Sequence, residues 1–308
     1  MLPASAQDWA VTTTSANYLR SAADYESPLE TQTLMGSILQ VNARTEGRWV
    51  NVTAKVPAYQ DCWTNAMTLA PMDEEQLHGY LADAKYIVTS EYSRVCDSPV
   101  GGNVICDLVM GDLLRKVFND KGKLVHTVSH AKVRLPDGRV GYVKFGDLAE
   151  FDGWLDRRAA DGREIISTAR KFTGTPYLWG GNSIKGVDCS GLVWMSYYMS
   201  GILLPRNASE LARTGMEVPL QALKAGDLLF YGNDEGQVTH VAIYTGEGGI
   251  IHSSQIVYEA SISPDSEAYY DRPILGARRI LGHLEDGEVK AGTIKSNPWF
   301  FPVAGTQL

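Results

Sequence analysis

The sequence lacks the features that define several large classes of protein. Its 308 residues include four cysteines, and none lies in a CxxC pair or another zinc-ligand spacing, which argues against a structural metal site. No apolar run approaches the roughly 18 residues that a transmembrane helix needs. Gly and Pro are scattered rather than periodic, which excludes collagen-like and low-complexity chains. We therefore expect a globular protein without a metal, a cofactor or a membrane-spanning helix.

Positive charge is scarce as well. The chain has 28 Lys plus Arg residues against 36 Asp plus Glu residues, so its net charge is −8. This balance argues against nucleic acid or an anionic membrane as the main partner. With 44% hydrophobic residues the chain can bury cores without disulfides, and its length predicts roughly two domains.

The start of the chain and two of its cysteines bear on the cellular compartment. Residues 1–8 contain ASA at 4–6, which fits the small-x-small rule of a signal-peptide cleavage site. They are either the remnant of an export signal, which predicts a periplasmic or secreted protein, or an ordinary terminus, which is also compatible with the cytoplasm. Cys96 and Cys106 flank a turn-rich stretch, so they form either a disulfide or two free buried thiols.

Two stretches, 9–70 and 84–150, have the alternating, β-branched pattern of short strands. They repeat weakly, because LMGSIL at 34–39 echoes LVMGDLL at 108–114. We expect two small β-barrels in tandem, joined by a linker over 71–83 that holds a short helix.

The pattern changes at about residue 160. Apolar residues at 165, 166, 169 and 172 recur at helical spacing, and Gly174 is expected to end that helix. Helices followed by antiparallel strands predict an α+β domain over 160–284. Residues 285–308 form an unassigned tail, expected to pack back onto the body. Within the α+β domain we expect a second helix over 190–199 and strands over 228–231, 241–244 and 250–252.

Cys189 lies where a Gly-rich loop turns into the second helix, in GTPYLWGGNSIKGVDCSGL at 174–192. The unpaired N–H groups and the dipole of a helix N-terminus favour a thiolate and offer donors to an oxyanion. The neighbouring Asp188 opposes thiolate formation and also fits a helix N-cap. The alternative for Cys189 is an inert buried thiol.

A nucleophilic cysteine needs a base, and His240 and His252 are spaced to supply one. The segment 239–252 reads as a hairpin with a three-residue loop at 246–248, which would place Ala242 opposite His252. The two histidines would then share a face as diagonal neighbours, roughly 7–8 Å apart at Cα. A four-residue loop would put them on opposite faces. The pattern favours Cys189 as nucleophile, His240 as base and His252 as the group that orients His240.

These segments resemble the NlpC family of bacterial cell-wall cysteine peptidases. The shared motifs are YLWGG at 177–181, DCSGL at 188–192, LPR at 204–206, AGDLLFY at 225–231, HVAIY at 240–244 and IHS at 251–253. The two β stretches resemble bacterial SH3-like barrels, and two such barrels before this domain resemble the γ-D-glutamyl-L-diamino-acid endopeptidases of stem-peptide recycling (dipeptidyl-peptidase VI type).

The resemblance implies a papain-like α+β fold and cleavage of the bond between γ-D-Glu and the diamino acid of a peptidoglycan stem peptide. It implies that Cys189, His240 and His252 are the catalytic triad and that Tyr177 lies near the oxyanion hole. It further implies that substrate is bound by Asp188, Ser190, Trp179, Glu30, Tyr59 and Ser209.

Three functions follow as hypotheses. The first is an endopeptidase that acts as a monomer on stem fragments such as L-Ala-γ-D-Glu-diamino acid. It prefers fragments with a free N-terminal amine, which Asp188, Glu30 and Tyr59 would recognise. The second is a hydrolase of intact peptidoglycan, and the third is a non-catalytic wall-binding protein. Arg206 either binds a substrate carboxylate or pairs with an acidic neighbour at the surface. On composition alone, Trp179 fits an aromatic core as well as a substrate subsite.

Overall fold

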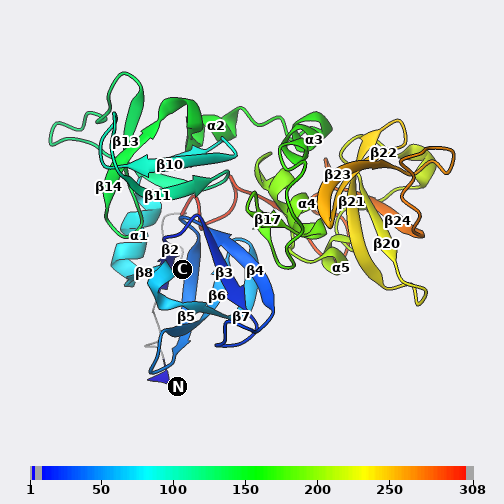
Figure 1. Cartoon of the computed structure of the whole chain (residues 1–308), viewed down its shortest axis with the longest axis horizontal. Helices are drawn as coiled ribbons and strands as arrows, with labels where there is room; N and C mark the ends of the chain where they lie inside the picture. The colour runs from blue at the N-terminus through cyan, green and yellow to red at the C-terminus, as the bar shows by residue number, and fades with distance from the viewer. Residues whose placement is uncertain (1, 4–8, 303–308) are drawn as a thin grey trace. The chain divides into compact units, whose positions relative to one another are not determined.

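A computed structural model describes residues 2, 3 and 9–302 and divides the chain into two compact units (Figure 1). The first unit contains residues 1–157 and 297–308, and the second contains residues 158–296. The expected signal-peptide remnant at 1–8 lies outside the described residues apart from 2 and 3. No helix in the described residues is long and apolar enough to cross a membrane.

The first unit opens with an antiparallel sheet in the order β4-β3-β7-β6-β5-β2-β8, and β1 also pairs with β5. Alternate residues of its strands point inward, and the buried set includes Leu19, Leu39 and Val52. The strands of this first sheet are β1 (Leu2–Pro3), β2 (Trp9–Thr12), β3 (Ala16–Arg20), β4 (Leu29–Leu34), β5 (Ile38–Arg44), β6 (Trp49–Lys55), β7 (Ala58–Asn65) and β8 (Leu69–Met72). The short helix η1 (Ala66–Thr68) connects β7 to β8.

The helix α1 (Glu74–Ala82) occupies most of the expected linker and begins at a capping box formed by Asp73 and Gln76. A second antiparallel sheet follows in the order β11-β10-β14-β13-β12-β9-β15. Its elements are β9 (Lys85–Val88), β10 (Tyr92–Cys96), β11 (Val104–Val109), β12 (Leu113–Lys116), β13 (His130–Arg134), β14 (Val140–Lys144), η2 (Phe145–Asp147), β15 (Leu148–Glu150) and the helix α2 (Phe151–Asp156).

The repeated segments of the two sheets meet each other. Gly36 and Gly111 occupy the same place in the repeat, and both have positive φ, +93° and +96°. The carbonyl of Met35 accepts a hydrogen bond from the backbone N–H of Leu113 at 3.0 Å, while Asp112 Oδ1 accepts one from the N–H of Met35 at 2.9 Å. The weak repeat in the sequence therefore marks the junction between the sheets.

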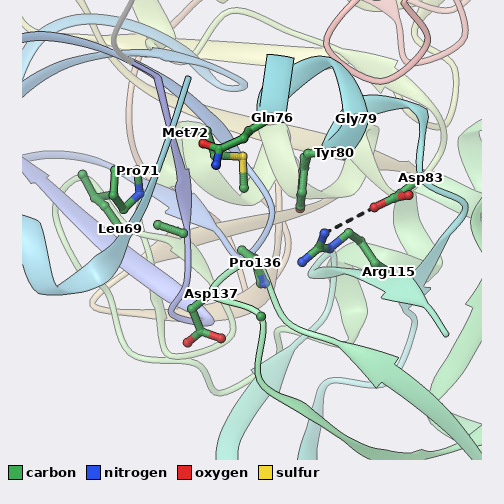
Figure 2. Close-up of a pocket in the computed structure, with 12 residues that line it drawn as sticks. Leu69, Pro71, Met72, Gln76, Gly79, Tyr80, Asp83, Arg115, Pro136 and Asp137 are labelled. Carbon is green, nitrogen blue, oxygen red and sulfur yellow. Dashed lines mark hydrogen bonds and ion pairs between the residues drawn. The ribbon is translucent and has the colours of Figure 1, made fainter. Parts of the chain in front are cut away.

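A cavity of about 590 Å³ lies between β8, α1 and the second sheet. Figure 2 shows Arg115 reaching toward Asp83, with Nη1 and Oδ2 3.3 Å apart, beside the Tyr80 ring. The guanidinium lies over that ring at 5.2 Å from its centroid and also donates to the carbonyl of Leu135. The cavity contains none of the residues expected to form the active site.

The end of the tail, from residue 297, belongs to the first unit together with Cys96 and Cys106, whereas residues 285–296 belong to the second unit. Trp299 packs against Trp9 with ring centroids 5.1 Å apart, and Phe301 stacks on Phe151 at 5.8 Å. Cys96 and Cys106 are both free thiols. Cys106 packs against the core of the second sheet, whereas Cys96 lines an outer groove, so they face opposite sides of the sheet and a disulfide would require rearrangement.

The second unit is α+β. Its sheet has the antiparallel order β19-β24-β20-β21-β22-β23, and α4 packs against β21 (Figure 1). The helix α3 ends at Arg170, four residues earlier than expected, and Gly174, with φ +83°, follows a further turn. The elements are α3 (Gly162–Arg170), β16 (Asn182–Ser183), β17 (Gly186–Val187), α4 (Cys189–Tyr198), β18 (Ile202–Leu203), α5 (Ala208–Leu211), β19 (Met216–Glu217), η3 (Leu220–Ala222), β20 (Leu228–Gly232), β21 (Val238–Gly246), β22 (Gly249–Ser254), β23 (Ile256–Ser261), β24 (Ile274–Arg279) and β25 (Gly292–Thr293).

Every residue of α4 is buried, because the helix lies between the sheet and the preceding loop rather than on the surface. The apolar face expected at 192, 195 and 199 is therefore part of a helix that is enclosed all round. The antiparallel strands after the helices agree with the expected α+β architecture.

Candidate active site

Cys189 is the first residue of α4, and Asp188 is its N-cap. The Asp188 carboxylate accepts a hydrogen bond from the backbone N–H of Gly191 at 2.6 Å and thereby satisfies one of the free donors of the first turn. Gly191 lies so close to the preceding loop that a Cβ there would stand 2.0 Å from the carbonyl oxygen of Gly181. Glycine is needed at this position because the loop is held directly against the start of the helix.

Asp188 also anchors a buried polar network. Arg206 binds it in a bidentate arrangement, with Nη1 3.0 Å from Oδ1 and Nη2 2.8 Å from Oδ2. Ser190 Oγ lies between them, 3.2 Å from Asp188 Oδ1 and 2.8 Å from Arg206 Nη1. The Arg206 side chain is only 1% exposed, so its acidic partner is a buried site residue and not the surface neighbour expected from the sequence.

The two histidines are brought together by the hairpin of β21 and β22. Ile243 pairs with Ile251, which puts Ala242 opposite His252 as expected. The loop itself differs from the expectation: Gly246 pairs with Gly249, so the turn has two residues, Glu247 and Gly248, with φ of +51° and +80°. This is the geometry of a type I′ turn. A bulge between Tyr244 and Gly246 absorbs the difference and preserves the pairing farther along the strands.

His240 Nε2 and His252 Nδ1 are 2.8 Å apart, and both rings are buried. If His240 Nε2 carries the hydrogen and donates it, Nδ1 of His240 is left as the acceptor that a thiol proton requires. In that arrangement His252 carries its own hydrogen on Nε2, an atom that has no hydrogen-bond partner within the described residues. The His252 ring instead contacts Tyr258 and Tyr270, with centroids 4.5 Å and 4.3 Å away.

The electrostatics of Cys189 differ from the expected thiolate. Burial and then the Asp188 carboxylate raise the pKa of the thiol to about 11, against the lowering effect of hydrogen bonds from the N–H groups of Val241 and Ser190. These two amides show that the sulfur lies against both the helix start and the residue after His240. Burial outweighs the helix terminus and favours the thiol over the thiolate.

The imidazoles are neutral as well. Burial lowers the pKa of His240 to about 3, with smaller contributions from the charges of His252 and Arg272. Burial and Arg272 lower the pKa of His252 to about 4. The site at pH 7 is therefore an uncharged thiol beside two uncharged imidazoles, and charge separation must accompany attack on the substrate.

The loop before Cys189 carries the two aromatic candidates. Burial raises the pKa of Tyr177, and the charges of Cys189 and Asp188 raise it further, which places the phenol in the same electrostatic environment as the sulfur. Trp179 is 67% exposed, so it is not part of the aromatic core that composition alone allowed. An exposed indole in the loop that leads to Cys189 is available to a ligand. Ser209 lies exposed in α5, and its carbonyl accepts a hydrogen bond from Arg213.

Glu30 and Tyr59 belong to the first sheet. The Tyr59 hydroxyl donates to Glu30 Oε2 at 2.7 Å, and both side chains are half-buried. Glu30 makes no ion pair with any residue in the described part of the chain. The pair thus holds a carboxylate whose charge is not neutralised by a cationic side chain.

Sequence reasoning missed Tyr270 and Arg272, which lie in the loop between β23 and β24. Tyr270 contacts both imidazole rings, and Arg272 donates to the hydroxyl of Thr239, the residue before His240, at 2.8 Å. The loop contains no recognisable motif, and 30 residues separate Tyr270 from His240, so only the tertiary structure reveals the contact.

Known proteins resemble this chain in sequence and in fold. Residues 174–279 match the model of the NlpC/P60 family. The γ-D-glutamyl-L-lysine dipeptidyl-peptidase of Bacillus cereus is 29% identical over 264 residues, which cover 82% of this chain and 75% of that protein. The Bacillus subtilis protein of the same name is 37% identical over 129 residues, or 41% of this chain and 44% of that protein. A crystal structure of an NlpC/P60 family protein from Bacillus cereus has a TM-score of 0.74 at 23% identity, covering 88% of this chain and 99% of that chain, and shows the same fold.

Proposed function

Starting from the NlpC/P60 domain that this chain carries at residues 174–279, we propose that the protein is a cysteine endopeptidase acting on peptidoglycan stem peptides. The bond it hydrolyses joins the γ-carboxyl of D-Glu to the diamino acid. The names of the Bacillus relatives support this substrate. The observation that carries the catalytic assignment is the hydrogen bond of 2.8 Å between His240 and His252, on a hairpin packed against the helix that Cys189 begins.

The proposed reaction begins with transfer of the Cys189 thiol proton to Nδ1 of His240 as the sulfur attacks the γ-carbonyl carbon. Backbone N–H groups at the start of α4 and the Tyr177 hydroxyl stabilise the oxyanion. His240 then returns the proton to the leaving amine as the C–N bond breaks. Water, deprotonated by His240, hydrolyses the thioester and restores the thiol.

His252 is a neutral hydrogen-bond acceptor at the third triad position, where the Ser-His-Asp triad has a carboxylate. It orients His240 and selects its tautomer, but it supplies no negative charge to the imidazolium. The imidazolium is therefore a strong acid in this site, which suits rapid return of the proton to the leaving amine.

Replacement of Cys189 by Ala tests the proposal. We expect mass spectrometry to show release of L-Ala-γ-D-Glu from the tripeptide L-Ala-γ-D-Glu-L-Lys by the wild type, and a loss of at least about a thousandfold in the variant. The matched control is Cys62→Ala, a buried thiol of the first unit, which should retain activity. Undiminished turnover by Cys189→Ala would overturn the assignment.

We further propose that the enzyme prefers fragments with a free N-terminal L-Ala, and that the first and second sheets are SH3-like modules, the first of which supplies Glu30 and Tyr59 for this purpose. The carboxylate of Glu30, held by Tyr59 and without a cationic partner in the described residues, supports recognition of an ammonium. Asp188 contributes less net charge than expected from the sequence, because Arg206 already neutralises it.

A tripeptide acetylated at its amine tests this preference. We expect acetylation to lower kcat/KM of the wild type by about a hundredfold, because it removes the ammonium that would pair with the half-buried Glu30 carboxylate. Glu30→Gln should reduce the ratio of kcat/KM between the free and the acetylated tripeptide, whereas the exposed control Glu46→Gln should leave that ratio unchanged. Equal turnover of both peptides would favour the alternative, a hydrolase of intact peptidoglycan, and such a wall-acting enzyme would also fit export to the periplasm or beyond.

A further inference from the structure

Arg272 lies beside the imidazole pair and is held in one orientation by neutral groups. Its Nη2 donates to Thr239 Oγ1 at 2.8 Å and to the carbonyl of Gly232 at 3.3 Å, and its Nη1 donates to the Tyr270 hydroxyl at 3.4 Å. Thr239 stands at a bulge, opposite the point where pairing between β20 and β21 shifts. The bulge turns this part of β21 toward the loop that carries Arg272.

The charge of Arg272 is not balanced by a carboxylate. No acidic side chain in the described residues lies within ion-pair distance, and two of its five N–H groups are left over after the three hydrogen bonds above. Arg206, the other arginine near the site, is by contrast fully engaged with Asp188. The two arginines therefore differ: one completes a buried pair, and the other presents a preorganised, unpaired guanidinium.

Without a bound anion, the positive charge of Arg272 opposes protonation of His240, the proposed general base. Arg272 contributes to the lowered pKa of both His240 and His252, so its charge reaches both rings and makes the imidazolium harder to form. An anion bound to Arg272 would cancel this effect. The arrangement is therefore suited to a substrate that brings negative charge to this side of His240.

The chemistry of the reaction identifies which part of the substrate that is. His240 protonates the leaving amine, so this amine must lie next to His240 when the C–N bond breaks. The amine belongs to the diamino acid, and its α-carbon bears a carboxyl group. A cationic group held beside His240 is therefore placed to meet the diamino acid as its amine leaves.

We propose that Arg272 binds a carboxylate of the diamino acid and makes the enzyme selective for it. This inference rests on the proposed endopeptidase function and adds the determinant on the leaving-group side. The carboxylate has two possible sources with the same chemistry: the free α-carboxylate of a stem tripeptide, or the second carboxylate that meso-diaminopimelate has and Lys lacks.

Three peptides separate these sources: L-Ala-γ-D-Glu-L-Lys, its C-terminal amide, and L-Ala-γ-D-Glu-meso-diaminopimelate amidated at the α-carboxyl only. We expect the wild type to show a KM about tenfold higher for the Lys amide than for the Lys acid, as expected for loss of one charge-assisted contact. If the α-carboxylate is the ligand, the diaminopimelate amide will match the Lys amide. If the second carboxylate also binds, its KM will return toward that of the Lys acid.

Arg272→Gln should reduce the ratio of the two Lys KM values to less than about twofold, and Arg272→Lys should keep part of it because the charge remains. The control Arg213→Gln removes an exposed arginine of the same unit and should preserve the full ratio. A wild type indifferent to both carboxylates, or an Arg272→Gln variant with undiminished discrimination, would overturn the inference.

Binding measured with Cys189→Ala makes the comparison without turnover. If that variant binds the Lys acid more tightly than the amide through Arg272, but the wild type cleaves neither, the endopeptidase proposal fails and the carboxylate site stands. If the wild type cleaves both without discrimination, the endopeptidase proposal stands and the carboxylate site fails.

Discussion

Each unit contains a buried aspartate at a turn. The carboxylate of Asp112 binds backbone N–H groups, whereas that of Asp188 binds both backbone N–H groups and an arginine. Asp112, fully buried in the first unit, accepts hydrogen bonds from the N–H groups of Val109 at 2.8 Å and Met35 at 2.9 Å. It joins main-chain segments of two sheets that are 77 residues apart in sequence. Asp188 in the second unit also accepts backbone hydrogen bonds, from Gly180 and Gly191, but binds the guanidinium of Arg206 as well.

The two buried carboxylates differ in whether a cationic side chain neutralises them. At the sheet junction the Asp112 carboxylate holds backbone segments in place. Beneath Cys189 the carboxylate is neutralised by Arg206, because an uncompensated negative charge there would raise the pKa of the thiol further. The Asp188–Arg206 pair therefore lies next to the Cys189 thiol without adding net charge to the site.

The largest effect should come from breaking the Asp188–Arg206 pair. Asp188→Asn leaves the buried guanidinium of Arg206 without its counter-charge, and we expect the free energy of unfolding of the second unit to fall by about 3–5 kcal/mol in urea titrations. The double variant Asp188→Asn/Arg206→Met removes both charges and should lose less than the single one. A double variant as unstable as the single variant would contradict this account of the pair.

Acid should destabilise the second unit through its two histidines. Their pKa values are lowered from 6.5 to about 3 and about 4 in the folded state, so between these values and pH 6.5 the unfolded chain binds more protons. Stability is full above pH 6.5 and falls as the pH drops toward 4, by about 1 kcal/mol per pH unit for each ring.

Denaturant titrations at pH 6.5, 5.5 and 4.5 measure this effect. The variant His240→Gln/His252→Gln should show a flatter dependence than the wild type, while replacement of the exposed His126 by Gln should change nothing. Parallel curves for the wild type and the double variant would show that these rings are not the source of the acid sensitivity.

The junction of the first unit should be less sensitive. Asp112→Asn replaces one acceptor by a donor that faces a backbone N–H, so we expect a loss of about 1–3 kcal/mol in the first unit. The exposed control Asp120→Asn should cost nothing measurable, and peptidase activity per folded molecule should persist in both variants. A loss as large as that of Asp188→Asn would remove the distinction between the two aspartates.

The smallest stability effect is expected at Trp179. Because its indole is 67% exposed, Trp179→Ala should change the free energy of unfolding by less than about 0.5 kcal/mol. If the indole contacts substrate, KM should nevertheless rise severalfold, whereas the control Leu220→Ala should alter neither quantity. A large loss of stability without a change in KM would instead assign Trp179 to packing.

Much of the local structure could be predicted from residue patterns. The helix that begins at Cys189, the N-cap at Asp188 and the pairing that brings His252 near His240 follow from periodicity, capping and turn chemistry, which act over a few residues. The turn between β21 and β22 was expected to be one residue longer, because a bulge at Thr245 has no distinct sequence signal. The exposure of Trp179 was equally open, since an aromatic ring suits a core and a binding surface alike.

The order of residues by itself therefore determined the helix that presents Cys189 and the hairpin that presents His240 and His252. Only the tertiary structure decided that Arg206 meets Asp188, that Arg272 has no carboxylate partner among the described residues, and that burial raises the pKa of the Cys189 thiol. These features depend on desolvation and on contacts between segments far apart in the chain, and both arise only when the unit closes around its buried polar groups.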